Sequence, residues 1–222
     1  MMASPDFLGV TLTGVDEFTP FDDIQALGQM PGVELAFLYS LDALGSRFVS
    51  LAWLLAVLPR LQCRTALHVC GSSARRQLLD GELGACMPWL GRVQVNGPVG
   101  VGELQRLADA VPQLITQHDA YNEPLARVHA PAHALLVDGS GGLGILPARW
   151  RRPETDKPVG FAGGLSLGNL PVQWGRIASV ATGPWWIDLE TGLRSKDDRF
   201  DAVEARRVAD LVASLAAAGF EG

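Results

Sequence analysis

The fold is constrained most by a repeated alternation of short apolar runs, rich in β-branched and aromatic residues, with segments of helical periodicity. Each of these runs has the length and composition of a β-strand. Eight strands are expected, at Phe7–Thr13, Val33–Ser40, Thr65–Cys70, Arg92–Asn96, Gln113–His118, His133–Asp138, Val159–Ala162 and Trp185–Leu189. Eight alternations in 222 residues favour a parallel sheet closed into a (β/α)8 TIM barrel. We therefore expect residues 1–222 to form a single TIM-barrel domain.

The segments between the strands differ in how strongly they predict helix. Helical periodicity is present at Phe21–Met30, Ser50–Leu61, Ser73–Leu79, Gly102–Val111, weakly at Asn122–His129, and at Asp201–Ala218. The stretch Gly139–Lys157 contains glycines, prolines and charges but little helical pattern, so it is expected to be a loop with at most a short helical turn. A loop of this length in a compact domain is often functional.

Composition narrows the class of ligand. A net charge of −6 argues against a protein that binds nucleic-acid backbone, since such proteins need a concentrated basic face. A small anionic ligand such as a phosphorylated metabolite remains possible, because backbone N–H groups can bind phosphate without net positive charge. We expect a monomer or homodimer, with no nucleic-acid partner and no membrane. Cys63, Cys70 and Cys86 lack metal-ligand spacing, so reduced thiols are expected and no metal or other cofactor is implied. The N-terminus lacks an export pattern, which favours a cytoplasmic location.

Polar side chains gather where the expected strands end. In a barrel of this type the carboxyl ends of the strands surround the active site. The residues at these ends are Thr11, Thr13, Tyr39, Ser40, His68, Cys70, Gln94, Asn96, Gln117, His118, Asp138, Gly163, Asp188 and Glu190. The sequence thus predicts a ring of hydrogen-bonding groups on an apolar barrel.

Five motifs, in this order and spacing, resemble those of phosphoribosylanthranilate isomerase, the barrel enzyme of tryptophan biosynthesis. They are the loop Gly45–Ser50, the strand ends Val93–Gly97 and Leu135–Asp138, the stretch Phe161–Leu165 followed by Asn169-Leu170, and Ile187–Leu193 followed by Asp197-Asp198. The resemblance implies a TIM barrel and an isomerase, which is an intramolecular oxidoreductase, acting on a phosphorylated sugar by an Amadori-type aldose–ketose rearrangement. It covers most of the chain.

The resemblance also implies roles for individual residues. Asp138 resembles the general acid, and Arg47 the residue that steadies an aromatic carboxylate. The backbones at Gly163-Gly164 and Thr191-Gly192, together with Gly141-Gly142, resemble the phosphate clamp. Glycine suits such a clamp because converging N–H groups need close approach to the phosphate, which a Cβ would obstruct.

The first strand departs from the isomerase pattern. Where those enzymes have a catalytic cysteine as general base, followed by glycine, this chain has Thr13-Gly14. A threonine hydroxyl keeps its proton near neutral pH, so another group must act as the base. Cys70, which shares a strand face with His68, and Glu190 are the two candidates.

Each of these residues also has a structural interpretation. Asp138 could cap a turn, Arg47 could pair with Asp42, and His68 or Cys70 could be core residues. Gln94 and Asn96 point the same way along one strand and could bind a hydroxylated ligand or only satisfy a neighbouring strand. Three functional hypotheses remain: an isomerase of this type, a divergent enzyme with a different substrate, and a non-catalytic barrel that binds phosphate ligands.

Overall fold

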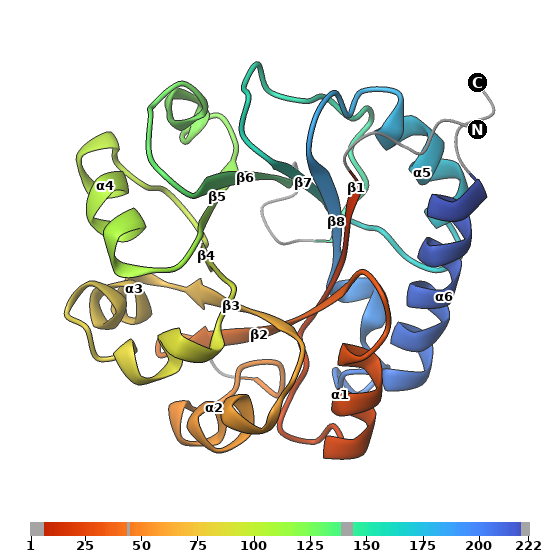
Figure 1. Ribbon diagram of the computed structural model, residues 1–222, viewed down its shortest axis with the longest axis horizontal. Helices are drawn as coiled ribbons and strands as arrows, with labels where there is room; N and C mark the ends of the chain where they lie inside the picture. The colour runs from red at the N-terminus through yellow and green to blue at the C-terminus, as the bar shows by residue number, and fades with distance from the viewer. Residues whose placement is uncertain (1–6, 44, 139–143, 219–222) are drawn as a thin grey trace.

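The computed structural model, which describes residues 7–43, 45–138 and 144–218, is a closed barrel of eight parallel strands in sequence order (Figure 1). The strands are β1 (Phe7–Thr13), β2 (Val33–Ser40), β3 (Arg64–Cys70), β4 (Arg92–Val95), β5 (Leu114–His118), β6 (His133–Asp138), β7 (Val159–Ala162) and β8 (Trp185–Leu189). Pairing of β8 with β1 closes the sheet. The TIM-barrel prediction is confirmed, and the strand bounds differ from those predicted by at most one residue.

Helices surround the barrel, as the view down its axis shows (Figure 1). They are α1 (Phe21–Gly28), α2 (Leu51–Val57), α3 (Ser72–Leu79), α4 (Val101–Ala110), α5 (Leu170–Ala178) and α6 (Ala202–Ala218), with short 3-10 helices η1 (Leu58–Arg60), η2 (Gly84–Trp89), η3 (Glu123–Ala126) and η4 (Thr191–Leu193). The weak helix expected at Asn122–His129 is only the turn η3. Between β6 and β7, the described residues 144–157 contain no helix, as predicted. No helix in the described ranges has the length and hydropathy to cross a bilayer.

Apolar side chains form two cores on opposite faces of the sheet. Alternate strand residues face outward, and on β3 Leu67 and Val69 join the core between sheet and helices. A smaller cluster of Ile115, Ala134, Leu136, Ala162 and Trp186 forms a second core from the other face of the sheet. The helices therefore hold the barrel from outside, while this inner cluster fills part of its interior.

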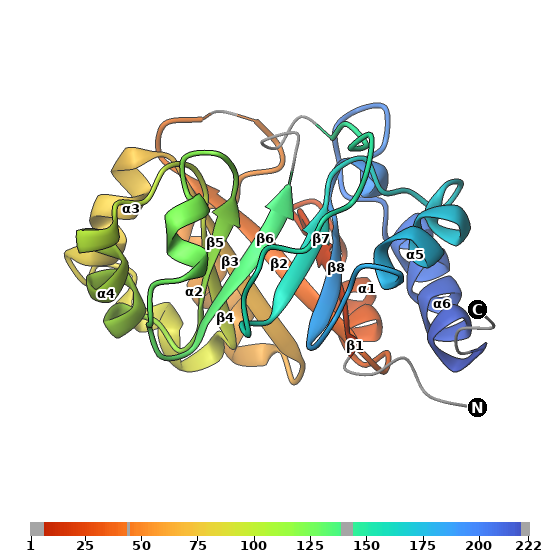
Figure 2. The same cartoon turned by 90° about the horizontal axis from the view of Figure 1, so that it is seen from above.

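The amino ends of the strands are closed by a buried ion pair and an indole. Arg92 donates hydrogen bonds to Glu34 (Nε to Oε2, 3.0 Å) and to Thr11, and its guanidinium lies 4.4 Å from the ring centroid of Trp186. Gly160 leaves room for this indole, since a Cβ built there would overlap the ring. In Figure 2 the strands run from this end up to the opposite rim, where the β6 arrow points.

We predict that Gly160→Ala destabilises the protein. The added methyl must displace Trp186 or Leu136, which costs about 1–3 kcal/mol in a packed core. Gly175→Ala is the matched control, because that helical position has open space around it and alanine there adds about 0.5–1 kcal/mol of stability. Urea denaturation measures both free energies of unfolding, and equal effects of the two substitutions would contradict the packing described.

Candidate functional site

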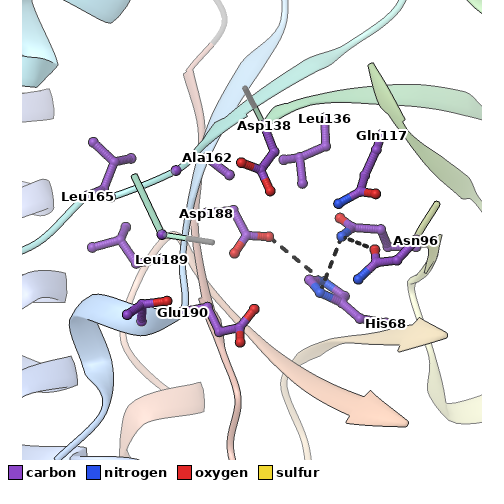
Figure 3. Close-up of a pocket in the computed structure, with 15 residues that line it drawn as sticks. His68, Asn96, Gln117, Leu136, Asp138, Ala162, Leu165, Asp188, Leu189 and Glu190 are labelled. Carbon is purple, nitrogen blue, oxygen red and sulfur yellow. Dashed lines mark hydrogen bonds and ion pairs between the residues drawn. The ribbon is translucent and has the colours of Figure 1, made fainter. Parts of the chain in front are cut away.

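A cavity opens at the carboxyl ends of the strands (Figure 3). Polar groups from five strands and the loops that follow them converge on it. Its lining consists of His68, Gln94, Asn96, Gln117, Leu136, Asp138, Gly144, Ala162, Gly163, Gly164, Leu165, Asp188, Leu189, Glu190 and Thr191. Most of the site residues predicted from the sequence are therefore brought together around one space.

Two carboxyl groups share a level of the barrel because of the strand register. Asp138 at the end of β6 stands beside Ala162 on β7, and the β7–β8 register continues this row to Asp188. Both carboxylates point into the cavity, with the small Ala162 between them (Figure 3). The arrangement allows a ligand to contact both carboxyl groups at once.

Asp188 is buried, and its carboxyl has an altered proton affinity. Burial raises the pKa of Asp188 from 3.8 to about 7, although a hydrogen bond from Thr13 Oγ1 to Asp188 Oδ1 (2.7 Å) works in the opposite direction. The negative charge of Glu190 raises this pKa further. A carboxyl group with such a pKa populates both protonation states near neutral pH, which suits proton transfer.

His68 lies beside Asp188 and is neutral. Burial, with the positive charge of Arg92, lowers its pKa to about 3. Its Nε2 lies 3.8 Å from Asp188 Oδ2 and has no hydrogen-bond partner in the described chain. Its Nδ1 lies 3.4 Å from Gln94 Nε2, which also donates to Asn96 Oδ1 (2.8 Å), while Gln94 Oε1 has no partner among the described residues.

The two bases proposed from the sequence occupy different environments. Cys70 does not line the cavity, and its thiol accepts a hydrogen bond from Asn96 Nδ2 (3.2 Å). Burial raises the pKa of Cys70 to about 12, so the thiol is protonated at neutral pH. Glu190 does line the cavity; burial raises its pKa, and an ion pair with Arg47 (2.8 Å) opposes that rise.

Arg47 reaches the rim from the β2–α2 loop but does not itself line the cavity. Its guanidinium binds both oxygens of Asp198 (3.2 and 2.7 Å) as well as Glu190. Asp42, the alternative partner suggested by the sequence, instead accepts hydrogen bonds from Ser73. Arg47 is therefore held by two carboxylates of its own chain.

A buried arginine joins the loops after β8 and β1. Arg194 donates to the carbonyl oxygen of Gly14 (2.6 Å) and pairs with Asp16 (3.1 Å) and Asp198. Asp16 also accepts a hydrogen bond from the backbone N–H of Phe200 (2.8 Å). This network fixes the rim beside Thr13.

The glycines assigned to a phosphate clamp bring three loops into contact. Gly163 and Gly164 have positive φ and line the cavity with Thr191, whereas Gly192 lies behind it. A Cβ on Gly164 would overlap the backbone of the β6–β7 loop, and one on Gly192 would overlap the carbonyl of Leu165. Gly141 and Gly142 lie outside the described residues.

The sequence places Asp188 at a strand end, but no motif in it indicates a role for this residue. The available signal was its spacing of two from Glu190, which puts both side chains on the same face of the strand. Pairing with Thr13, 175 positions away, depends on closure of the barrel and could not be read from local pattern. The described residues contain no cluster of three or more His, Cys, Asp or Glu that could hold a metal ion.

We predict that Asp188→Asn stabilises the protein more at pH 8 than at pH 5. The folded state keeps the Asp188 proton up to about pH 7 and the unfolded chain only to 3.8, so wild-type stability falls as pH rises through this window. The amide carries no such penalty, and the gain should be larger at pH 8 by about 2 kcal/mol. Denaturant unfolding at both pH values measures the difference in free energy of unfolding between variant and wild type. Asp197→Asn, at an exposed position, is the control. A stabilisation by Asp188→Asn that does not depend on pH would contradict the burial argument.

Fold and cavity together define a single (β/α)8 barrel with an acidic site at the carboxyl ends of its strands. The solved structures similar to this chain include phosphoribosylanthranilate isomerases, in agreement with the motif resemblance. The enzyme from Thermus thermophilus has a TM-score of 0.69 at 21% identity, over 93% of this chain and 99% of that one. TrpF from Jonesia denitrificans has a TM-score of 0.69 at 17% identity, over 94% of this chain and 98% of that one.

A third similar structure is a phosphoribosylanthranilate isomerase in complex with reduced 1-(o-carboxyphenylamino)-1-deoxyribulose 5-phosphate. Its TM-score is 0.67 at 13% identity, over 94% of this chain and all of that one. No protein-family model and no curated protein sequence matches the chain. These comparisons establish a shared fold over nearly the whole chain, at identities that do not carry a substrate across.

Proposed function

We propose that the protein is an isomerase of the phosphoribosylanthranilate isomerase type, which interconverts aldose and ketose forms of a phosphorylated sugar by acid–base chemistry. The observation that carries the proposal is the pair Asp138 and Asp188, which face one cavity while Asp188 has a pKa of about 7. An isomerase of this kind needs a group that accepts a proton from carbon and one that donates a proton to oxygen.

In the proposed reaction, Asp138 and Asp188 donate and accept the protons that are transferred. Asp138 gives a proton to the ring oxygen of the sugar as the bond from C1 to that oxygen breaks. Asp188 takes the proton from C2, which leaves an enol or enolamine. Asp188 then gives its proton to C1 and Asp138 takes the enol proton as the ketone forms, so both groups return to their starting states and no oxidant or reductant is consumed.

Thr13 supports this role for Asp188. Its hydroxyl occupies the position of the catalytic cysteine in the resemblance and donates to Asp188 Oδ1, which orients the carboxylate with Oδ2 toward His68. A base on β8 thereby replaces a base on β1. Among the alternatives, Cys70 has the less suitable pKa and Glu190 is engaged by Arg47.

The phosphate is assigned to the rim formed by Gly163, Gly164 and Thr191, which line the same cavity as the two carboxyl groups. Positive φ at both glycines turns the backbone sharply, and the missing side chain of Gly164 lets the β6–β7 loop pack against this rim. Backbone N–H groups bind phosphate without a cationic side chain. This placement leaves the sugar beside Asp138 and Asp188.

We predict that the protein catalyses exchange of the C2 hydrogen of a phosphorylated sugar with solvent. Proton NMR in D2O follows this exchange directly, using phosphoribosylanthranilate, ribose 5-phosphate and glucose 6-phosphate as substrates. Asp188→Asn and Asp138→Asn should each slow the exchange by about 10²–10⁴-fold. Phosphate-ester binding without exchange would instead support a non-catalytic binding barrel and contradict the proposal.

We further predict that Thr13→Val shifts the pH dependence of exchange. The rate should rise with pH as Asp188 loses its proton, with a midpoint near 7 in the wild type. Since the hydrogen bond from Thr13 lowers the pKa of Asp188, its removal should move that midpoint upward. A lower rate with an unmoved midpoint would show that Thr13 does not act through Asp188.

A further inference from the structure

The end of the cavity away from the glycine rim carries unpartnered hydrogen-bonding groups of both kinds. His68 Nε2 and Gln94 Oε1 are buried without hydrogen-bond partners in the described chain, and both residues line the cavity. Because Gln94 Nε2 faces His68 Nδ1, the ring proton belongs on Nε2, which makes that atom a donor; it lies 3.8 Å from Asp188 Oδ2. A buried donor or acceptor without a partner destabilises the protein unless a ligand or water forms the missing hydrogen bond.

A hydroxyl group matches this pair, since it accepts one hydrogen bond and donates another. A carboxylate does not, because it is an acceptor only and would leave the Gln94 oxygen facing a negative charge. Figure 3 shows His68 and Gln117 on the same side of the cavity, opposite Leu165 and Leu189. The polar side of the site is therefore built from neutral groups.

The carboxyl group beside His68 disfavours an anionic group at this end of the cavity. Asp188 Oδ2 lies 3.8 Å from His68 Nε2, and no lysine or arginine lines the cavity. Residues outside the described ranges cannot add a positively charged side chain to the cavity, because they contain no lysine, arginine or histidine. Arg47, behind Glu190, already directs three N–H groups to the carboxylates of Glu190 and Asp198.

From this we infer that the substrate is a phosphorylated polyhydroxyl compound whose end remote from the phosphate is neutral and carries hydroxyl groups, not a carboxylate. This inference rests on the proposed function, since it extends the same site. It separates the chain from an enzyme for a ligand of the o-carboxyphenylamino type. Arg47 serves to hold Glu190 and Asp198 in place, and His68 with Gln94 selects the remote end of the ligand.

Two ligands that differ only at that end provide the test. D-Ribitol 5-phosphate ends in a hydroxymethyl group, and D-ribonate 5-phosphate has a carboxylate in its place. Calorimetric titration of the wild-type protein should show at least about tenfold tighter binding of the ribitol compound, equivalent to the loss of a buried hydrogen bond plus charge repulsion. Equal or tighter binding of the ribonate compound would overturn the inference while leaving the proposed function intact.

A substitution at Gln94 tests whether this residue selects the remote end of the ligand. Gln94→Leu removes the acceptor and should weaken ribitol 5-phosphate at least about tenfold, while the affinity for inorganic phosphate stays within about twofold. Exposed Gln105→Leu makes the same change outside the cavity and should alter neither affinity. Unchanged ribitol 5-phosphate binding in Gln94→Leu would refute the subsite. If neither sugar phosphate nor inorganic phosphate binds the wild type, the proposed function fails together with the inference.

Discussion

The site depends on the burial of one carboxyl group, Asp188, in the mouth of the barrel. Removal from water favours its neutral form, and only the hydroxyl of Thr13 and the more distant Arg92 oppose that effect. The result is a group with a pKa of about 7 where an ordinary aspartate is fully ionised. Closure of the barrel makes this possible, because β1 and β8 are neighbours only in the closed sheet.

The interior of the barrel is organised around this group in two zones. At the amino ends of the strands, Glu34 and Arg92 form a buried, hydrogen-bonded pair against Trp186. At the carboxyl ends, polar residues line the cavity, and His68 Nε2 and Gln94 Oε1 lack hydrogen-bond partners within the described chain. The Glu34–Arg92 pair is thus satisfied within the protein, whereas these two atoms can be satisfied by a ligand or water.

Much of the fold could be predicted from sequence because each strand has its own local pattern. The bounds of β1, β2, β6, β7 and β8 agree with the predictions, since apolar β-rich runs there end at glycine, proline or acidic residues. The segment Asn122–His129 forms only η3, since Pro124 lies within a short and weakly periodic stretch. Candidate residues such as His68, Asp138 and Glu190 were found because strand ends define the rim.

What the sequence did not reveal depends on contacts between distant segments. The pairing of Arg47 with Asp198 spans 151 positions and converts an expected ligand-binding arginine into part of an internal network. The environment of Cys70 likewise depends on Asn96 from the next strand. Residue type alone could not distinguish a buried, protonated thiol from a reactive one.

The central claim is that Asp188 titrates near neutral pH while hydrogen-bonded to Thr13. The most direct measurement is a carbon-13 NMR titration of the side-chain carboxyl signals, with Asp188→Asn used to assign the resonance. A midpoint near pH 7 in the wild type, moving upward in Thr13→Val, is the expected result. A midpoint near 4, the ordinary value for an aspartate, would contradict the account.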